Sequence, residues 1–261
     1  MIDVAAELTR RELDTVLVGF GVTNQAVARA LLRAGHRAVV VDDHPVDRLR
    51  AVAHDIGVSL IEGPETSELS DLVERADAVF PAPGLPESHP AFDLAGEHGV
   101  AVAGELDLAR AWDDRPIAAV TGTNGKTTVV DLTVTALRES GIRAMAAGNT
   151  DVPLVEAIDD ASIDVFVVEA SSFRLARAQA FAPRVATWLN FAPNHLAVHR
   201  DLQGYERANA AIWTHLPDDA VAVANAADPV VMSHLPSDRQ VVTFGAHGDW
   251  RRDGDDLIGP S

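Results

Sequence analysis

The single lysine of this chain, Lys126, lies in a glycine-rich run at residues 121–128. All other side chains with a fixed positive charge are arginines, which indicates that arginine cannot replace the lysine here. An apolar stretch precedes the run and a helical pattern follows it, so the run is predicted to be a turn from a strand into a helix. Such a turn surrounds phosphate with backbone N–H groups, while a lysine reaches the β- and γ-phosphates. The predicted nucleotide-binding residues are Gly122, Thr123, Asn124, Gly125, Lys126, Thr127 and Thr128.

The run is shorter than the full phosphate-loop pattern, which has a glycine where this chain has Val120. What remains is Gly122, two intervening residues, and then Gly125, Lys126 and Thr127. The alternative interpretation is a polar turn with a chance lysine. We favour a nucleoside triphosphate site because the lysine is isolated, with Lys126 as a catalytic residue and the Thr127 hydroxyl as a Mg²⁺ ligand.

Three further strand ends carry polar residues. Glu169 closes an apolar strand and is followed by Ser171 and Ser172. A carboxylate at this position in a phosphate-loop domain is suited to hold Mg²⁺, although a strand-end glutamate can also simply face solvent. His195 follows another apolar strand and is a candidate catalytic residue that could ligate a second metal or contact a phosphate, although a loop histidine is more often structural. Asn149 follows a glycine at a third expected strand end.

The first third of the chain has its own glycine turn. Gly19, Gly21 and Asn24 resemble a dinucleotide-binding pattern in which asparagine replaces the last glycine, and Asp42 and Asp43 follow the next strand. A partial pattern of this kind is weak support for NAD. The physical reading is narrower: the turn binds a diphosphate while Asp42 accepts hydrogen bonds from a sugar or base. The alternative is a tight turn that serves packing alone.

Short apolar runs alternate with helical patterns along the whole chain. The expected strands are 15–20, 38–41, 58–61, 78–80, 100–103, 117–120, 164–169, 185–189, 221–224 and 241–244. This alternation predicts an α/β fold with doubly wound parallel sheets. A polar connector around Pro116 predicts a boundary between a domain at 1–114 and a second α/β domain at 115–261.

Composition excludes several classes of protein. A net charge of −18 argues against nucleic acid as a partner, because phosphate backbones need a basic surface. No apolar stretch is long enough to span a bilayer, and the first residues lack the apolar core of a signal peptide. With no cysteine, disulfides and thiolate metal sites are excluded. Together with nucleotide chemistry, these features favour a cytoplasmic protein without membrane insertion.

The order of these motifs resembles that of the Mur ligases. The stretches that carry the resemblance are 19–24, 83–90, 104–108, 121–128, 148–149, 169–173 and 190–195. The Ser-Ser-Phe run after Glu169 is similar to the branch that adds D-glutamate to UDP-N-acetylmuramoyl-L-alanine. The resemblance implies a Rossmann-like domain for the UDP substrate, then a phosphate-loop ATP domain, with the family's C-terminal domain absent from this chain or supplied separately.

The resemblance also implies a role for each matching residue. The UDP part of the substrate would contact Gly21, Val22, Thr23, Asn24, Asp42, Asp43, Pro83 and Gly84, whereas the loop at 83–84 is by itself also compatible with an ordinary turn. Asn149, Ser171 and Ser172 would place the substrate carboxylate. Mg²⁺ would lie between Thr127 and Glu169, with His195 near a second ion. The carboxylate would attack the γ-phosphate of ATP, and the amine of D-glutamate would capture the acyl phosphate.

Three departures from the family pattern keep other readings open. The chain ends at Ser261, inside the family's central domain; Asn194 replaces an aspartate; and Asn209 stands where the family carbamylates a lysine to hold the second metal. A non-catalytic homologue that binds nucleotide sugars or ATP is therefore an alternative. A Mur-type amide ligase for another carboxylate is a second one. A nicotinamide oxidoreductase would leave Lys126 unexplained.

Overall fold

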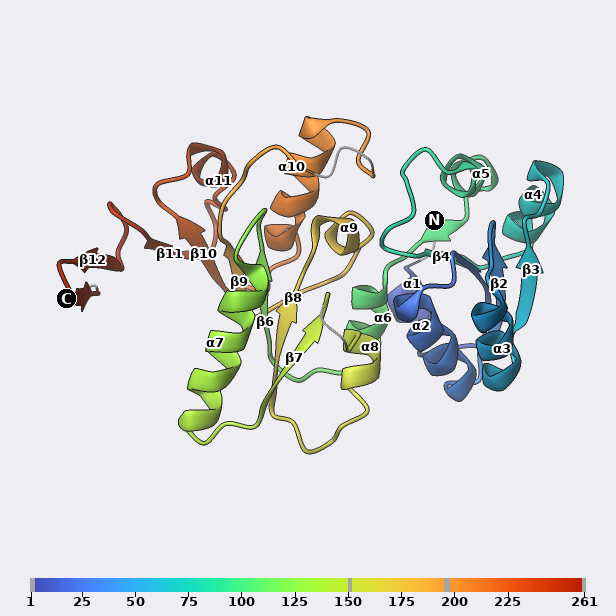
Figure 1. Ribbon diagram of the computed structural model, residues 1–261, viewed down its shortest axis with the longest axis horizontal. Coiled ribbons are helices and arrows are strands. Elements are labelled where there is room, and N and C mark those ends of the chain that lie inside the picture. The colour runs from blue at the N-terminus through green and yellow to red at the C-terminus, as the bar shows by residue number, and fades with distance from the viewer. Residues whose placement is uncertain (1–2, 150–151, 195–197, 260–261) are drawn as a thin grey trace. The chain divides into compact units, whose positions relative to one another are not determined.

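The chain folds into two compact units, each built on a parallel sheet with helices (Figure 1). The computed structural model describes residues 3–149, 152–194 and 198–259. The first unit contains Met1–Asp114 together with Pro153–Asp159 and Arg177–Ala180, and the second contains the remainder. The predicted α/β class with parallel sheets is confirmed.

The first unit has five parallel strands in the order β3-β2-β1-β4-β5. They are β1 (Asp14–Val18), β2 (Arg37–Asp42), β3 (Ser59–Glu62), β4 (Ala78–Pro81) and β5 (Ala101–Val102). The helices are α1 (Val4–Glu7), α2 (Val22–Arg33), α3 (Asp47–Ile56), α4 (Thr66–Glu74), α5 (Pro90–His98), α6 (Glu105–Trp112) and α8 (Leu154–Ala157). The strand order reverses between β1 and β4, and open α/β sheets bind ligands at the carboxyl ends of such strands.

The second unit has six parallel strands in the order β11-β10-β9-β6-β8-β7. They are β6 (Ile117–Thr121), β7 (Ala144–Gly148), β8 (Val165–Glu169), β9 (Val185–Trp188), β10 (Val221–Asn225) and β11 (Gln240–Phe244). The helices are α7 (Lys126–Glu139), α9 (Ser172–Leu175), α10 (Leu202–Ala210), the 3₁₀ helix η1 (Ala211–Trp213) and α11 (Pro229–Ser233). Helix α7 buries Val130 and Val134 against the sheet, which fixes the helix that begins at Lys126.

Two short strands follow β11. Strands β12 (Arg251–Asp253) and β13 (Asp256–Ile258) form an antiparallel hairpin. Gly254 lies in the hairpin turn with φ of +60°. The two residues between the strands are Gly254 and Asp255, and a Gly-Asp pair is typical of a two-residue hairpin turn, so local sequence accounts for the element.

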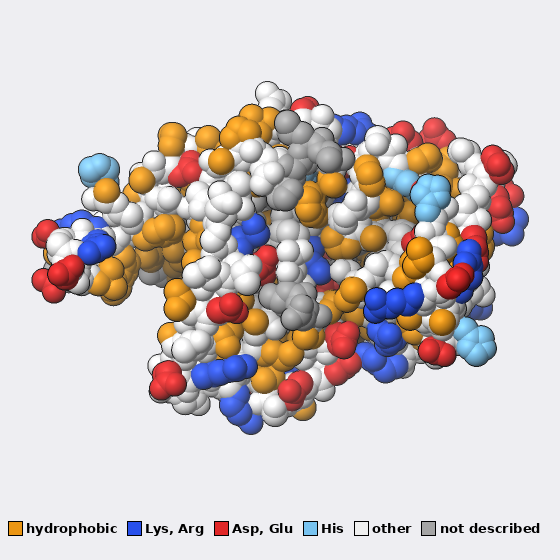
Figure 2. All heavy atoms as spheres, in the orientation of Figure 1, with side chains coloured by type: hydrophobic (Ala, Val, Ile, Leu, Met, Phe, Trp, Pro, Cys, Tyr) orange, Lys and Arg blue, Asp and Glu red, His pale blue; other side chains and the backbone are white. Residues whose placement is uncertain are grey.

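The surface is rich in charge, and no described helix is long and apolar enough to cross a membrane. On the face shown in Figure 2, acidic side chains are interspersed with arginines.

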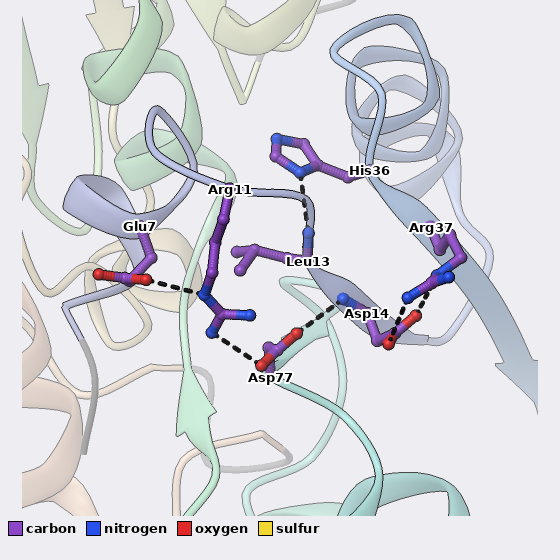
Figure 3. A network of polar contacts seen from close by, with 7 residues as sticks. All are labelled: Glu7, Arg11, Leu13, Asp14, His36, Arg37 and Asp77. Atoms are coloured by element: carbon purple, nitrogen blue, oxygen red, sulfur yellow. Dashed lines mark hydrogen bonds and ion pairs between the residues drawn. The ribbon is translucent and has the colours of Figure 1, made fainter.

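A polar network fastens the amino ends of the strands in the first unit (Figure 3). Arg11 donates to Asp77 at 2.8 Å, and the other oxygen of Asp77 accepts the backbone N–H of Asp14 at 2.9 Å. Nearby, His36 Nδ1 accepts the backbone N–H of Leu13 at 3.2 Å. His36 is 4% exposed, so this bond requires a neutral imidazole acceptor in a buried position.

The titration of His36 should make the first unit less stable in mild acid. Burial lowers the pKa of His36 below its ordinary 6.5, against the opposing effect of a backbone hydrogen bond at Leu8. The unfolded chain therefore takes up this proton at higher pH than the folded chain. The stability from neutral His36 is complete above about pH 6.5 and is lost as the pH falls through the lowered pKa.

We predict that His36→Gln, which keeps a hydrogen-bond acceptor, reduces the loss of stability between pH 7 and pH 5. Urea unfolding of both proteins across this range measures the difference. Identical pH profiles for the wild type and the variant would show that His36 does not titrate in the folded state as we infer.

Candidate functional site

The glycine-rich run forms a tight loop between β6 and α7. Gly122 has φ of +135°, and a Cβ there would lie 3.1 Å from the backbone N and O of Asn190. Gly125 has φ of +84° and caps α7, whose first residue is Lys126. Glycine is required at Gly122 both by its φ and by this close approach.

The loop is held by the segment that follows β9. Thr123 N donates to the carbonyl of Asn190 at 3.1 Å, and Asn124 N donates to its side-chain oxygen at 2.9 Å. The Asn190 amide in turn donates to the carbonyl of Asn124 at 3.0 Å, and the Thr123 hydroxyl donates to the carbonyl of Ala192 at 3.1 Å. Sequence reasoning gave Asn190 no role, although its position directly after the predicted strand at 185–189 is a usable signal.

The side chain of Lys126, the first residue of α7, folds back onto the glycine-rich loop. Its Nζ donates to the carbonyls of Gly122 at 2.7 Å and Thr123 at 3.2 Å. Desolvation by burial lowers the pKa of Lys126, while the carboxylate of Glu169 acts in the opposite direction. The ammonium group is thus half-buried and close to the backbone that the sequence predicts to bind phosphates.

The buried side chain of Glu169 bonds to the first turn of α7 and to the loop after β7. It is 3% exposed, and its Oε2 accepts the Thr127 hydroxyl at 2.7 Å while its Oε1 accepts the Asn149 amide at 3.0 Å. Asn149 N also donates to the Glu169 carbonyl at 2.8 Å. Gly148 makes this approach possible, because a Cβ there would lie 2.6 Å from that carbonyl oxygen. Three predicted site residues therefore lie together, because the buried carboxylate of Glu169 bonds to both Thr127 and Asn149.

The two serines after β8 differ in their surroundings. Ser171 is 7% exposed, and its Oγ has no hydrogen-bond partner within the described part of the chain. Ser172 Oγ shares a hydrogen bond of 2.9 Å with Nε2 of His199, which is 2% exposed and stacks on Phe173. Sequence reasoning missed His199, because a single histidine in an irregular loop has no periodic or spacing signal.

The oxygen atoms of Thr127 and Glu169 suit one Mg²⁺ ion, which takes few protein ligands and completes its shell with water and phosphate. His195 lies outside the described residues. Asn209 is 1% exposed; its Oδ1 accepts the Thr121 hydroxyl and its Nδ2 donates to the Tyr205 carbonyl, both at 2.9 Å. Among the described residues, no group of three His, Asp or Glu could hold a metal. Asn209 therefore does not fit as the ligand of a second ion.

In the first unit, the glycine turn leads into α2. Gly19 has φ of +82° and Gly21 is the N-cap of the helix. Asn24 is 1% exposed, and its amide donates to the carbonyls of Gly19 at 2.8 Å and Phe80 at 3.0 Å. The first two residues of α2 differ in exposure: Val22 is exposed and Thr23 is buried. Asn24 thus fastens β1 to β4, and its role in substrate binding stays a prediction.

The predicted acidic pair follows β2. Asp42 accepts the backbone N–H of Phe20 at 2.8 Å and so supports the turn, while Asp43 lies 3.1 Å from Nε2 of His89. Residues 83–84 lie in the turn after β4, with Gly84 exposed. The contact between Asp43 and His89 brings two stretches of the first unit together, and their substrate contacts also stay predictions.

A matched pair of glycines tests the packing at Glu169. Gly148 and Gly141 both have positive φ, but a Cβ at Gly141 would meet nothing within 4 Å. We predict that Gly141→Ala costs about 1–2 kcal/mol from its backbone conformation. Gly148→Ala should cost a further ~1–3 kcal/mol, because the backbone of Glu169 must move. Chemical denaturation of both variants measures the two costs, and equal losses would argue against the close approach.

The sequence was compared with known proteins. Residues 120–256 match the Mur ligase middle domain family. The chain is 39% identical over 217 residues to the UDP-N-acetylmuramoylalanine–D-glutamate ligase of Desulfosudis oleivorans, covering 82% of this chain and 47% of that protein. It is 36% identical over 216 residues to the enzyme of the same name from Thermus thermophilus, covering 83% and 49%. The chain spans about half the length of the curated relatives it matches.

Solved structures show the same fold. The UDP-N-acetylmuramate:L-alanyl-gamma-D-glutamyl-meso-diaminopimelate ligase from Neisseria meningitides aligns with a TM-score of 0.59 and 17% identity, covering 95% of this chain and 84% of that one. A murein peptide ligase from Psychrobacter arcticus aligns with a TM-score of 0.54 and 18% identity, covering 92% and 56%. At these identities the likeness concerns the fold alone.

Proposed function

Because the chain belongs to the Mur ligase family, we propose that it forms the UDP-substrate and ATP-binding part of a ligase of peptidoglycan precursor synthesis. The reaction we propose is the addition of D-glutamate to UDP-N-acetylmuramoyl-L-alanine, which is the activity named for the relatives at 36–39% identity. The observation that carries the proposal is the cluster of Thr127, Glu169 and Asn149 beside Lys126. A C-terminal domain, in the same chain or a separate one, would complete the enzyme.

The proposed chemistry begins with phosphoryl transfer. An oxygen of the substrate carboxylate attacks the γ-phosphorus of ATP, the bond to the β-phosphate oxygen breaks, and an acyl phosphate and ADP result. Residues 122–128 orient the phosphates through backbone N–H groups, and Lys126 exchanges its loop carbonyls for phosphate oxygens. Thr127 and Glu169 would hold Mg²⁺, which supplies positive charge to the phosphate oxygens when bound.

The second step forms the amide bond. The amine of D-glutamate attacks the acyl carbon, inorganic phosphate leaves, and the amine loses a proton. Asn149, Ser171 and Ser172 would position the carboxylate for the first step. The buried Ser171 hydroxyl without a described partner supports this role, because buried polar groups in proteins are nearly always hydrogen-bonded.

The first unit would bind the UDP part of the substrate. The turn at 21–24 presents the start of α2 for a diphosphate, and Asp42 and Asp43 would contact the base or sugar. The loop at Pro83 and Gly84, in which Gly84 is exposed, would form part of the same subsite. The predicted cytoplasmic location belongs to this proposal as well.

Two observations favour a second candidate function, a homologue that binds nucleotides without turnover. Both the oxygen and the nitrogen of the Asn209 amide form hydrogen bonds inside the protein, and the residue before His195 is the neutral Asn194. ADP release that requires both this chain and UDP-N-acetylmuramoyl-L-alanine would exclude this candidate. ADP release with a different carboxylate, and none with this one, would instead identify a Mur-type ligase of other specificity.

The nucleotide part of the proposal predicts a specific effect at Lys126. Lys126→Met should weaken the binding of ATP with Mg²⁺ by about 10- to 100-fold, since one or more charge-assisted hydrogen bonds are lost. Lys126→Arg should also weaken binding, because a planar guanidinium does not fit the loop as an ammonium does. Titration calorimetry measures both affinities.

The control is Arg252→Met, which removes an exposed positive charge in the terminal hairpin. Its affinity for ATP should equal that of the wild type. If the wild type does not bind ATP, or if Lys126→Met binds it as well as the wild type, the proposed nucleotide site is wrong.

A further inference from the structure

The two aspartates that follow β2 differ in what bonds to them. Both oxygens of Asp42 accept backbone N–H groups of the first unit: Oδ2 accepts Phe20 N at 2.8 Å, and Oδ1 accepts His44 N at 3.1 Å. The side chain of Asp43 is 49% exposed, and its Oδ2 lies 3.1 Å from Nε2 of His89. Asp42 therefore supports the backbone of the turn, whereas Asp43 is held by a side chain from another loop.

The backbone of α5 fixes which nitrogen of His89 carries the hydrogen. Nδ1 of His89 accepts the backbone N–H of Ala91 at 3.2 Å and so caps the amino end of the helix. Because a backbone N–H only donates, Nδ1 is the unprotonated nitrogen of a neutral ring. Nε2 then carries the hydrogen and donates it to Asp43. One side chain thus caps a helix and orients a half-exposed carboxylate.

The loop that carries His89 holds the ring in a defined position. His89 N donates to the carbonyl of Pro86 at 2.9 Å, which closes a turn just before α5. Pro86 and Pro90 restrict the backbone on either side, because a proline ring fixes φ. The side chain of His89 is 10% exposed, so the ring is packed into the first unit. The direction of its Nε2–H bond is therefore set before a ligand arrives.

The bond between His89 and Asp43 lies where the strand order of the first sheet reverses. His89 follows β4 and Asp43 follows β2, and β1 lies between these two strands. The bond therefore connects two strands that do not pair, beside the end of β1, where the glycine turn leads into α2. The start of α2 is the predicted diphosphate site, and open α/β sheets bind nucleotides at such a point. Asp43 is thus oriented next to the predicted site.

We propose that Asp43 accepts a hydrogen bond from the nucleoside, either from an N–H of the base or from an O–H of the ribose, and that His89 is its positioning residue. The inference rests on the proposed function, which places the UDP part of the substrate in this unit. Within the described part of the chain, His89 is the side chain that bonds to this carboxylate, and it uses Oδ2, so Oδ1 is left for the ligand. A group that is already oriented loses less conformational freedom when the ligand binds.

Two variants of His89 separate the orientation of Asp43 from the capping of α5. In His89→Asn the side-chain oxygen takes the place of Nδ1 and still caps the helix, but the side chain is too short to reach Asp43. In His89→Gln the amide nitrogen takes the place of Nε2 and still donates to Asp43, but the cap is lost. His89→Asn should raise the Kd for UDP about three- to tenfold with an unchanged urea midpoint, whereas His89→Gln should lower the midpoint and keep the Kd within about twofold. Calorimetry and urea unfolding of the full chain measure both quantities.

Analogues of UDP identify the group that donates to Asp43. Asp43→Ala should raise the Kd for UDP about tenfold or more, as for the loss of a hydrogen bond to a charged group. UDP methylated at N3 of the uracil lacks the only N–H donor of the base, and the 2′-deoxy and 3′-deoxy analogues each lack one ribose hydroxyl. The analogue without the relevant donor should bind to the wild type and to Asp43→Ala with equal affinity. An effect of Asp43→Ala that persists with all three analogues would contradict the proposed contact.

His98→Asn is the matched control. His98 is the last residue of α5, at the opposite end from His89, and it is exposed. Its Nε2 shares a hydrogen bond of 2.9 Å with the hydroxyl of Ser70, so the variant also removes a histidine bond from the same helix. The affinity for UDP should stay at the wild-type value in this variant.

The outcomes distinguish this inference from the proposed function. If the wild type binds UDP and both Asp43→Ala and His89→Asn bind it equally well, the inference is wrong while the proposed function stands. Equal weakening by His89→Asn and His89→Gln would also overturn it, because His89 would then act through the fold of its loop and not through Asp43. If the wild type binds neither UDP nor UDP-N-acetylmuramoyl-L-alanine, the proposed function fails and this inference fails with it.

Discussion

The second unit depends on how the buried carboxylate of Glu169 is satisfied. Strand β8 lies between β6 and β7, and the registers pair Glu169 with Val120 on one side and with Gly148 on the other. Because parallel strands end at the same edge of a sheet, the residues just beyond these partners reach the carboxylate. Thr127 and Asn149 therefore supply its two hydrogen bonds. A carboxylate without them would be too costly to bury.

The opposite neighbour of β6 completes the arrangement. Strand β9 ends beside β6, with Thr121 paired to Trp188, so the residues after Trp188 pack against the glycine loop. Asn190 bonds to the loop backbone from that side, while Glu169 bonds to the start of α7 from the other. The loop is thus held between two strand ends. The Lys126 ammonium, which bonds to loop carbonyls, is the group that can exchange these partners for a ligand. Its nearest partners are backbone carbonyls, and a phosphate oxygen is a stronger acceptor than these for an ammonium.

Much of the fold could be predicted from local sequence, because buried parallel strands are short apolar runs and glycines mark the turns between elements. Polar residues at expected strand ends also identified Glu169 and Asn149 as candidates, and the isolation of the single lysine identified Lys126. The order of the strands could not be predicted, since it depends on pairings between residues far apart in the chain. That order alone makes Asn149 and Thr127 share Glu169. The same limit hid the bonds of Asp107 to residues 179–180, which lie more than seventy positions away.

The neutral residue at position 209 has a physical explanation in the hydrogen-bond chain that contains it. Thr121 donates to Asn209, Asn209 donates to the backbone of Tyr205, and the Tyr205 hydroxyl shares a hydrogen bond with Thr123. This chain joins α10 to both ends of the turn at 121–123. A carbamate or carboxylate at position 209 would bring a buried negative charge that only a cation could balance. The amide removes that requirement, so the order of the phosphate loop does not depend on a second metal. In the proposed reaction, charge neutralisation at the phosphates would then rest on Lys126 and on one cation that Thr127 and Glu169 would hold.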